Sequence, residues 1–369
     1  MIQRLAVIGT GLIGASIGLA AKRAGVAHVA GYDPDAGSSG VAAERGAVDA
    51  VAVSAADAVA DADLAVVAAP IADLPREVAA VLEASGDGTT VTDVGSTKAA
   101  VCAAAGRSPR FVGGHPICGS HARGADHATA DLFDGATWFL APLASTDPER
   151  YRLVHGFVSA LGATPVAVDP HAHDRIVALT SHLPHVLANV LVNQAGSTRV
   201  EGHEPLAAAG GSLRDMTRVA GANPRIWVDI FLDNAAAIRE ALADHRRRIE
   251  QVESALDQGD GGFLARWIAE ASSHRRRMLA DAYPDPGALQ RVRVHVPDRP
   301  GVFGGITTAL GAERINIEDF EMHHFSPERG GVLTLLVTGE DEAQRAAALL
   351  EAQGYGVQVS PVLEDEKDA

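Results

Sequence analysis

The feature that most constrains the fold is a glycine-rich loop near the N-terminus. Residues 9–14 read Gly-Thr-Gly-Leu-Ile-Gly, between the apolar run Arg4–Gly9 and a helical pattern over Ile13–Arg23. Glycines at the first, third and sixth positions allow a tight turn, close approach of a pyrophosphate, and close packing of the helix on the strand. The spacing therefore predicts a strand–loop–helix unit that binds a dinucleotide at the helix N-terminus. A glycine turn without a ligand is the alternative.

Asp33 indicates which dinucleotide fits this loop. It ends a second strand pattern, His28–Tyr32, about 20 residues beyond the loop. A carboxylate there accepts hydrogen bonds from both ribose hydroxyls and repels a 2′-phosphate, so we expect NAD and not NADP. The residues expected to bind NAD are Gly9, Thr10, Gly11, Leu12, Ile13, Gly14, Asp33, Pro70 and Ser96.

Three domains are predicted along the chain. Residues 1–168 alternate short apolar runs, such as Leu64–Ala69 and Thr90–Val94, with Ala-rich helical stretches. Strands that are apolar throughout and separated by helices indicate a parallel sheet covered on both faces. We therefore expect an α/β Rossmann domain over 1–168, followed by two domains of different character.

Residues 169–284 are expected to form an all-α domain. The predicted helices are His171–Gln194, kinked at Pro184, then Pro224–Leu256 and Phe263–Ala282. The second helix carries an apolar stripe wide enough to cover a partner, so we expect a homodimer, with packing inside one chain as the alternative. The stripe consists of Ile226, Trp227, Ile230, Phe231, Ala237 and Ile238.

Residues 288–363 are expected to form a small α+β domain. Over Gln290–Val296 every second residue is valine, a pattern typical of a half-buried strand. A helix from Pro300, two strands around a turn at Pro327–Gly331, a helix to Gln353 and a last strand near Val357–Val362 complete a βαββαβ order.

Composition excludes several classes of partner. The formal net charge of −16 argues against nucleic-acid binding, because phosphate contacts need a basic face. No stretch approaches the about 20 apolar residues of a membrane span, so no membrane partner is expected. Two cysteines and no N-terminal leader pattern fit a cytoplasmic protein.

The predicted reaction centre consists of Ser96, in Asp93-Val-Gly-Ser-Thr-Lys98, and His115, in a Gly-Gly-His-Pro run. Both lie at strand ends, where ligands bind in such sheets. An imidazole with an ordinary pKa near ~6.5 is suited to accept a hydroxyl proton as a hydride leaves the same carbon. A loop histidine bonded to backbone is the alternative for His115, and a Cys118–His115 nucleophile pair is a weaker one.

Polar residues on the predicted helices offer further site candidates. Ser181-His-Leu-Pro-His185 places two histidines on an otherwise apolar helix, but no carboxylate or cysteine set completes a metal site, and we expect none. Arg214 and Arg218 suit a planar carboxylate, and from spacing alone surface solvation explains them equally well.

Taken together and in order, these motifs resemble one family. They are the glycine loop, DVGSTK at 93–98, GGHPICGS at 113–120, SHLPH at 181–185 and GGSLRDMTRVAGANPRIWVDIF at 210–231. They resemble the prephenate/arogenate dehydrogenases of tyrosine biosynthesis over about residues 4–280. The C-terminal segment, with Pro297–Gly301 and Asn316–Ile317, resembles an ACT domain, a small-molecule sensor.

The resemblance implies an NAD-dependent oxidative decarboxylation of prephenate to 4-hydroxyphenylpyruvate. By position, His115 matches the proton acceptor and Ser96 the serine beside the ring hydroxyl and nicotinamide. The substrate-binding positions it implies are His185, Arg218, Ser181, His173, Asp215 and Trp227, the last of them able to reach across a dimer. In the ACT-like segment it implies an effector, tyrosine, and regulatory positions Asp298, Gly301 and Asn316.

One departure leaves prephenate versus arogenate open. The residue after the GGHPICGS run is often acidic in the family, and here it is His121, which weakly favours a keto acid over an amine. A 3-hydroxyacid dehydrogenase is disfavoured because no lysine lies between Lys98 and Lys367. The alternative of another class is a non-catalytic sensor of amino acids or NAD.

Overall fold

The computed structural model describes residues 2–118, 123–280, 285–326 and 330–362. Contacts divide the chain into a compact unit over 1–247 and a second over 248–369, with the division inside the helix Ala235–Gln258. The predicted α/β, all-α and α+β order is confirmed. The boundaries 168/169 and 284/288 stay a prediction.

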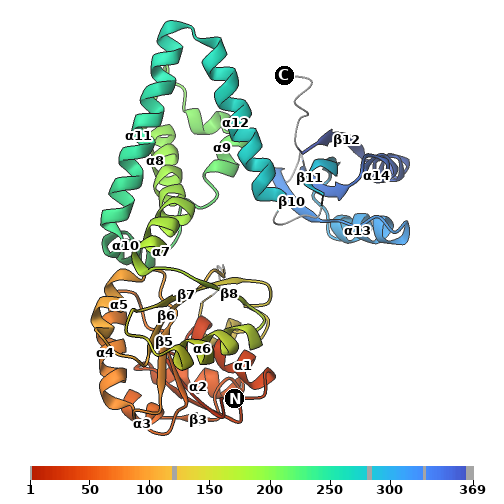
Figure 1. The fold of residues 1–369 in the computed structure, drawn as a ribbon. Helices are drawn as coiled ribbons and strands as arrows, with labels where there is room; N and C mark the ends of the chain where they lie inside the picture. Colours follow the sequence, from red (N-terminus) through yellow and green to blue (C-terminus); the bar gives the residue numbers. More distant parts are fainter. Residues whose placement is uncertain (1, 119–122, 281–284, 327–329, 363–369) are drawn as a thin grey trace. The chain divides into compact units, whose positions relative to one another are not determined.

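A mixed sheet forms the core of residues 1–168 (Figure 1). Among the described residues its strand order is β3-β2-β1-β4-β5-β6-β7-β8. All neighbours pair in parallel except β6 and β7, which are antiparallel. The strands are β1 (Arg4–Ile8), β2 (His28–Tyr32), β3 (Ala50–Val51), β4 (Leu64–Val67), β5 (Thr90–Asp93), β6 (Phe111–Pro116), β7 (Thr137–Pro142) and β8 (Thr164–Ala167).

Helices cover both faces of this sheet, as the apolar strands predict. Alternate residues of β1 belong to different cores, because successive side chains point to opposite faces: Leu5 packs with α1 and α6, and Ala6 with α3, α4 and α5. These helices lie on opposite sides of the strands in Figure 1. The helices are α1 (Leu12–Arg23), α2 (Ala36–Glu44), α3 (Ala55–Val59), α4 (Leu74–Ala84), α5 (Ala99–Ala105) and α6 (Pro148–Ala160).

The first predicted helix of the all-α region is interrupted earlier than expected. It divides into α7 (Pro170–Val177), a π-helical turn (Ala178–His182) and α8 (Leu183–Ser197). Pro184 lies in the first turn of α8 and lacks the N–H that would continue the preceding ladder, so the irregularity falls before it. The turn ends at His182, inside the SHLPH motif.

The prediction of one helix over Pro224–Leu256 is wrong. The structure has α10 (Pro224–Asp233) and α11 (Ala235–Gln258), separated at Asn234. Asparagine competes with helical backbone for hydrogen bonds, and the buried Asn234 side chain bonds elsewhere, to α7 and His182. A short helix α9 (Gly211–Met216) precedes them, and α12 spans Gly261–Ala280.

One helical stretch differs from the expectation about membranes. Pro170–Ser197 spans 28 residues and is long and apolar enough, by length and composition, to cross a bilayer. One such helix is weak evidence, because core helices of soluble proteins reach the same values. This stretch carries His173, His182 and His185 of the candidate site, and the absence of a membrane partner stays a prediction.

Residues 289–361 form the predicted small α+β sandwich. Its sheet has the order β10-β11-β9-β12, with all pairs antiparallel, and its apolar face packs on two helices. The βαββαβ order is confirmed. The elements are β9 (Leu289–Val296), α13 (Val302–Ala312), β10 (Asp319–Ser326), β11 (Gly330–Thr338), α14 (Glu340–Ala352) and β12 (Gly356–Pro361).

Candidate active site

The predicted cofactor and reaction-centre residues converge on one edge of the large sheet. Because β1, β4, β5 and β6 are parallel neighbours, the loops after them meet at their carboxyl edge. The glycine loop follows β1, Pro70 follows β4 and Ser96 follows β5. His115 lies near the end of β6. The sheet thus brings together residues that are far apart in the chain.

The loop after β1 has the shape that a dinucleotide needs. Gly9 has φ +95°, and a Cβ there would lie 2.4 Å from the carbonyl oxygen of Ala68. A Cβ on Gly14 would lie 1.8 Å from the oxygen of Gly9, so α1 packs on the loop only with glycine there. At Gly11 nothing lies within 4 Å of such an atom. The space beside Gly11 and the N-terminus of α1 fit the pyrophosphate of NAD.

Asp33 is held at the end of β2 next to this loop. Its Oδ2 accepts from the backbone N–H of Thr10 at 2.8 Å, and its Oδ1 from Asp35 at 3.0 Å. A carboxylate accepts about four hydrogen bonds, so both oxygens retain capacity for ribose hydroxyls. These contacts fit the predicted preference for NAD.

His115 belongs to a hydrogen-bonded chain of two imidazoles and a carboxylate. Its Nδ1 lies 2.9 Å from Nε2 of His173, and Nδ1 of His173 lies 2.8 Å from Oδ1 of Asp174. A carboxylate only accepts, so Nδ1 of His173 carries the hydrogen. With both rings neutral, Nε2 of His173 accepts from Nδ1–H of His115. Nε2 of His115 then carries the ring's lone pair, as a proton acceptor requires.

The surroundings keep His115 neutral and Asp174 ionised. Burial, followed by electrostatic repulsion of a proton on His115 by His173, Lys98 and His182, lowers the pKa of His115 well below its ordinary 6.5. Burial opposes ionisation of Asp174, but hydrogen bonds from His173 and from the N–H groups of Ala99 and Lys98 lower its pKa overall. The expectation of an ordinary pKa for His115 is therefore wrong, because the ring is buried among other basic groups.

The lowered pKa of His115 predicts where kcat/KM falls on the acid side of its pH profile. The proton acceptor must be neutral, so kcat/KM should be full above the pKa of His115 and fall as the pH drops through it. Because that pKa is lowered, the limb should lie below 6.5. Rates of NADH formation between about pH 4.5 and about pH 8 test this; a limb at or above the ordinary value would contradict it.

Cys118 does not have the character of a nucleophile. Burial raises the pKa of its thiol to about 11, so the thiolate is scarce at neutral pH. The Cys118–His115 pair is therefore unsupported, and Cys118 packs against the sheet core. Gly119, Ser120 and His121 lie outside the described residues.

The helical residues of the site centre on a stack of His185 on Trp227. The ring centroids are 3.5 Å apart with an interplanar angle of 26°, and both rings belong to one chain. Nδ1 of His185 lies 2.9 Å from the carbonyl oxygen of Ser181 and donates to it, which leaves Nε2 free for a ligand. Burial lowers the pKa of His185, and the charge of Arg218 lowers it further.

Arg218 and Asp215 lie on or just after α9 and are exposed. Arg218 is close enough to His185 to affect its ionisation, so an arginine and an imidazole are available to one anionic ligand. Ser181 and His185 flank His182 across the π-helical turn and the start of α8. The predicted substrate residues therefore come from α7 to α10.

Four residues of this site were not predicted. Asp174 orients His173, Asn234 donates to Nδ1 of His182 and to the oxygen of Asp174, and Asp93 and Lys98 form a buried ion pair. Asp93 and Lys98 were visible in the DVGSTK run, since charged residues directly after an apolar strand need partners. Asp174 and Asn234 gave no such signal, because their partners lie far along the chain.

The predicted regulatory residues do not lie together in one chain. Gly301 precedes α13, and Oδ2 of Asp298 lies 3.5 Å from Nε2 of His324. Asn316 follows the other end of α13 and donates to Oε1 of Glu318 at 2.9 Å. A helix of 11 residues separates the two ends by about 16 Å. One small effector cannot contact both within one chain.

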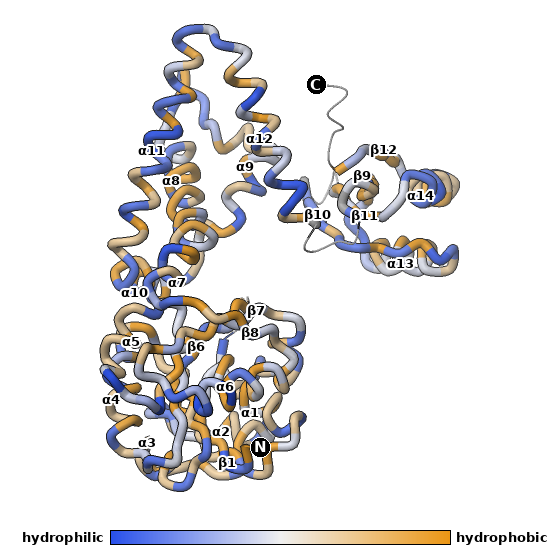
Figure 2. The backbone as a smooth tube through the Cα atoms, viewed as in Figure 1, coloured by the Kyte–Doolittle hydropathy of each residue, from blue (hydrophilic) through white to orange (hydrophobic). Residues whose placement is uncertain are grey.

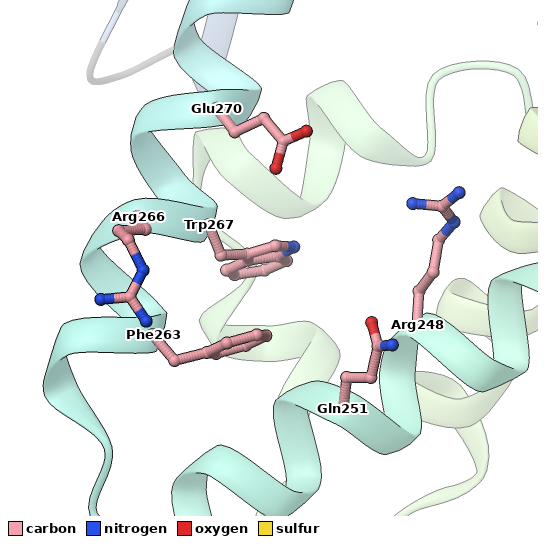
Figure 3. Close-up of a pocket in the computed structure, with 6 residues that line it drawn as sticks. All are labelled: Arg248, Gln251, Phe263, Arg266, Trp267 and Glu270. Carbon is pink, nitrogen blue, oxygen red and sulfur yellow. The ribbon is translucent and has the colours of Figure 1, made fainter.

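A separate cavity of about 320 Å³ lies in residues 248–270 and contains no predicted site residue. Figure 3 shows Phe263 and Trp267 extending from α12 toward the helix that carries Arg248 and Gln251. Trp267 is 46% exposed and Ile268 61% exposed. Apolar positions recur along α8, α11 and α12 in Figure 2. Val190 on α8 and Leu256 on α11 are also each more than half exposed.

Comparison with known families agrees with this arrangement. Residues 17–167 match the family model for the prephenate dehydrogenase nucleotide-binding domain, and residues 169–270 match that for the prephenate dehydrogenase dimerization domain. Residues 290–354 match the ACT domain. The fold and the site are those of an NAD-dependent dehydrogenase.

Individual relatives cover from about three quarters of the chain to nearly all of it. The prephenate dehydrogenase of Bacillus subtilis is 31% identical over 364 residues, covering 96% of this chain and 97% of its own. The chain belongs to the prephenate dehydrogenase family. Arogenate dehydrogenase from Synechocystis has a TM-score of 0.69 at 28% identity over 74% of this chain and 99% of its own. Prephenate dehydrogenase from Aquifex aeolicus, in complex with hydroxyphenyl propionate and NAD⁺, has a TM-score of 0.69 at 26% identity. The match covers 75% of this chain and 99% of its own.

Proposed function

We propose that the protein oxidatively decarboxylates prephenate to 4-hydroxyphenylpyruvate, with arogenate as the alternative substrate. The observation that carries the proposal is the chain His115–His173–Asp174, which holds a neutral proton acceptor at the sheet edge that also carries the glycine loop. When bound there, NAD⁺ supplies the acceptor for the hydrogen and electron pair lost by the ring carbon. Loss of CO₂ and aromatisation then drive the reaction forward, so the protein mainly has to position the ring and accept a proton.

The residues have distinct tasks in this proposal. Nε2 of His115 accepts the proton of the ring hydroxyl, and the Ser96 hydroxyl orients that group. Arg218 binds a carboxylate of the dianionic substrate as a planar charged donor. His185, stacked on Trp227, presents Nε2 toward the same anion. Ser181 and Asp215 support these groups.

Initial rates of NADH formation from prephenate and from arogenate test the proposal. We expect the higher kcat/KM with prephenate. A higher value with arogenate would reverse the substrate assignment. No NADH from either substrate, with NAD still bound, would favour the non-catalytic sensor.

Arg218→Ala is expected to raise KM for the substrate about 10–100-fold, with a smaller change in kcat, because it removes a charge-assisted contact present throughout the reaction. Steady-state kinetics with prephenate measure this. Arg239→Ala, at an exposed position on α11, is the matched control. A loss confined to kcat would contradict the binding role of Arg218.

We further propose that the protein is a homodimer whose second copy covers the exposed apolar side chains of α8 and α10. Val190 on α8 and Leu232 on α10 are each more than half exposed, and soluble monomers rarely expose large apolar patches. The match of residues 169–270 to a dimerization domain supports the same partner. Sedimentation equilibrium, which measures the mass of the assembly in solution, tests the dimer.

We also propose that the protein is cytoplasmic. Its two cysteines, Cys102 and Cys118, are free thiols, which suits the reducing conditions of the cytoplasm.

We also propose tyrosine as an inhibitor bound to the ACT domain. Because Gly301 and Asn316 lie at opposite ends of α13, an effector that uses both has to lie between two copies. Asn316→Ala in the full chain should raise the inhibitory concentration of tyrosine about tenfold, the loss of one good hydrogen bond, with kcat unchanged. Gln353→Ala, exposed beyond α14, is the control. Unchanged inhibition would argue for an effector at the active site.

A further inference from the structure

We propose that the buried Asp93–Lys98 ion pair is a positioning pair that sets Ser96 and His115 relative to each other. Both residues act through their neighbours in this inference, which rests on the roles proposed above for Ser96 and His115. Both side chains are 0% exposed. A buried ion pair is weak evidence for stability, because apolar residues of similar volume often replace one without loss. Its presence therefore needs another explanation.

Asp93 connects the two reaction-centre segments directly. Its Oδ2 accepts from Lys98 Nζ and from the N–H of Gly95 at 2.8 Å. Its Oδ1 accepts from the N–H of Gly114 at 3.0 Å. Gly95 precedes Ser96, and Gly114 precedes His115. One carboxylate thus fixes the backbone next to each predicted reacting side chain.

This bridge lies where the sheet no longer holds the two segments together. The pairing of β5 with β6 covers only Val91 with Phe111 and Thr92 with Val112. Beyond it, β6 continues along β7 and β5 gives way to the Ser96 loop. The Asp93 side chain therefore replaces backbone hydrogen bonds at the end of the ladder.

Lys98 joins the pair to the imidazole chain. Its backbone N–H donates to Oδ1 of Asp174 at 2.7 Å, the oxygen that also bonds His173. Its ammonium neutralises Asp93, and its charge helps to keep His115 unprotonated. The charged and titratable groups around it come from four elements: Asp93 on β5, Cys102 on α5, His115 on β6, and His173 and Asp174 on α7.

The test is the double variant Asp93→Asn/Lys98→Met, which removes both charges at nearly constant volume. An asparagine at position 93 has one acceptor oxygen for the backbone N–H groups of Gly95 and Gly114. It therefore holds these two segments together less firmly than the carboxylate does. We expect kcat with prephenate to fall about 10–100-fold through misplacement of Ser96 and His115, with the Kd for NAD within about twofold.

The control is Asp49→Asn/Lys22→Met, which removes the other lysine–aspartate pair of this domain at a partly exposed position. It should leave kcat unchanged. Thermal unfolding of both variants separates folding from positioning. A folded Asp93→Asn/Lys98→Met enzyme with wild-type kcat would overturn the positioning role, whereas inactivity of the wild-type chain toward prephenate and arogenate would instead remove the proposed function.

Discussion

His115→Asn is expected to lower kcat about 10²–10⁴-fold while leaving the Kd for NAD nearly unchanged. Asparagine can donate to Nε2 of His173 in place of the imidazole Nδ1–H, so the local structure has a partner at that position. It has no basic nitrogen to accept the hydroxyl proton, and the reaction would have to release that proton to water. Stopped-flow measurement of NADH formation at saturating prephenate, with NAD binding followed by fluorescence, gives both quantities.

His171→Asn is the matched control for this variant. His171 is exposed at the start of α7, two positions from His173, and should tolerate the change with unaltered kcat. The acid limb of the pH profile should also disappear in His115→Asn, since the titrating group is gone. Retained turnover with a normal acid limb would remove His115 as the proton acceptor and leave only the dinucleotide-binding fold of the proposal.

The parts of this fold that could be predicted from the sequence are those whose signal is local. The glycine loop, Asp33 and the valine alternation of β9 each depend on residues within one or two elements, and their periodicity shows directly in the chain. The structure places Gly9, Asp33, Ser96 and His115 at one sheet edge because parallel strands put every following loop there.

The parts that could not be predicted depend on long-range partners. The hydrogen bond from His115 to His173 spans 58 positions, and no local pattern marks the pair. Asn234 has the residue type of a helix breaker, yet it stands inside a continuous apolar stripe, and the periodicity outweighed it in the prediction of one helix. Its partners, His182 and the carbonyl of Asp174, appear only once α7 and α10 pack together.

The pKa of His115 illustrates the same limit for chemistry. Its residue type predicts a group that titrates near neutrality, and the glycine and proline neighbours favour an active-site loop. Burial and three basic neighbours lower that pKa, and all three become neighbours only through the fold. The role assigned from the sequence stays a proposal, but the pH range in which it operates follows from the structure.

His173→Asn is expected to lower kcat about 10²–10³-fold, the second largest effect. Asparagine keeps a donor for Asp174 near the Nδ1 position but is too short to offer an acceptor at the Nε2 position. Nδ1–H of His115 then has no partner, and the ring no longer favours the tautomer with Nε2 free. In a serine protease, disturbing the equivalent tautomer control lowers kcat about 10⁴-fold. The same kinetic assay at saturating substrate measures the loss.

His173→Gln separates this mechanism from a general packing defect. The longer glutamine places its amide oxygen near the lost Nε2, where it can accept from His115, but it offers no donor to Asp174. If tautomer control through His115 is what matters, kcat should recover at least about tenfold relative to His173→Asn, despite comparable disturbance of a fully buried site. Equal losses of kcat in both variants would mean that His173 acts only by filling space between His115 and Phe139. The ring centroids of Phe139 and His173 are 5.3 Å apart.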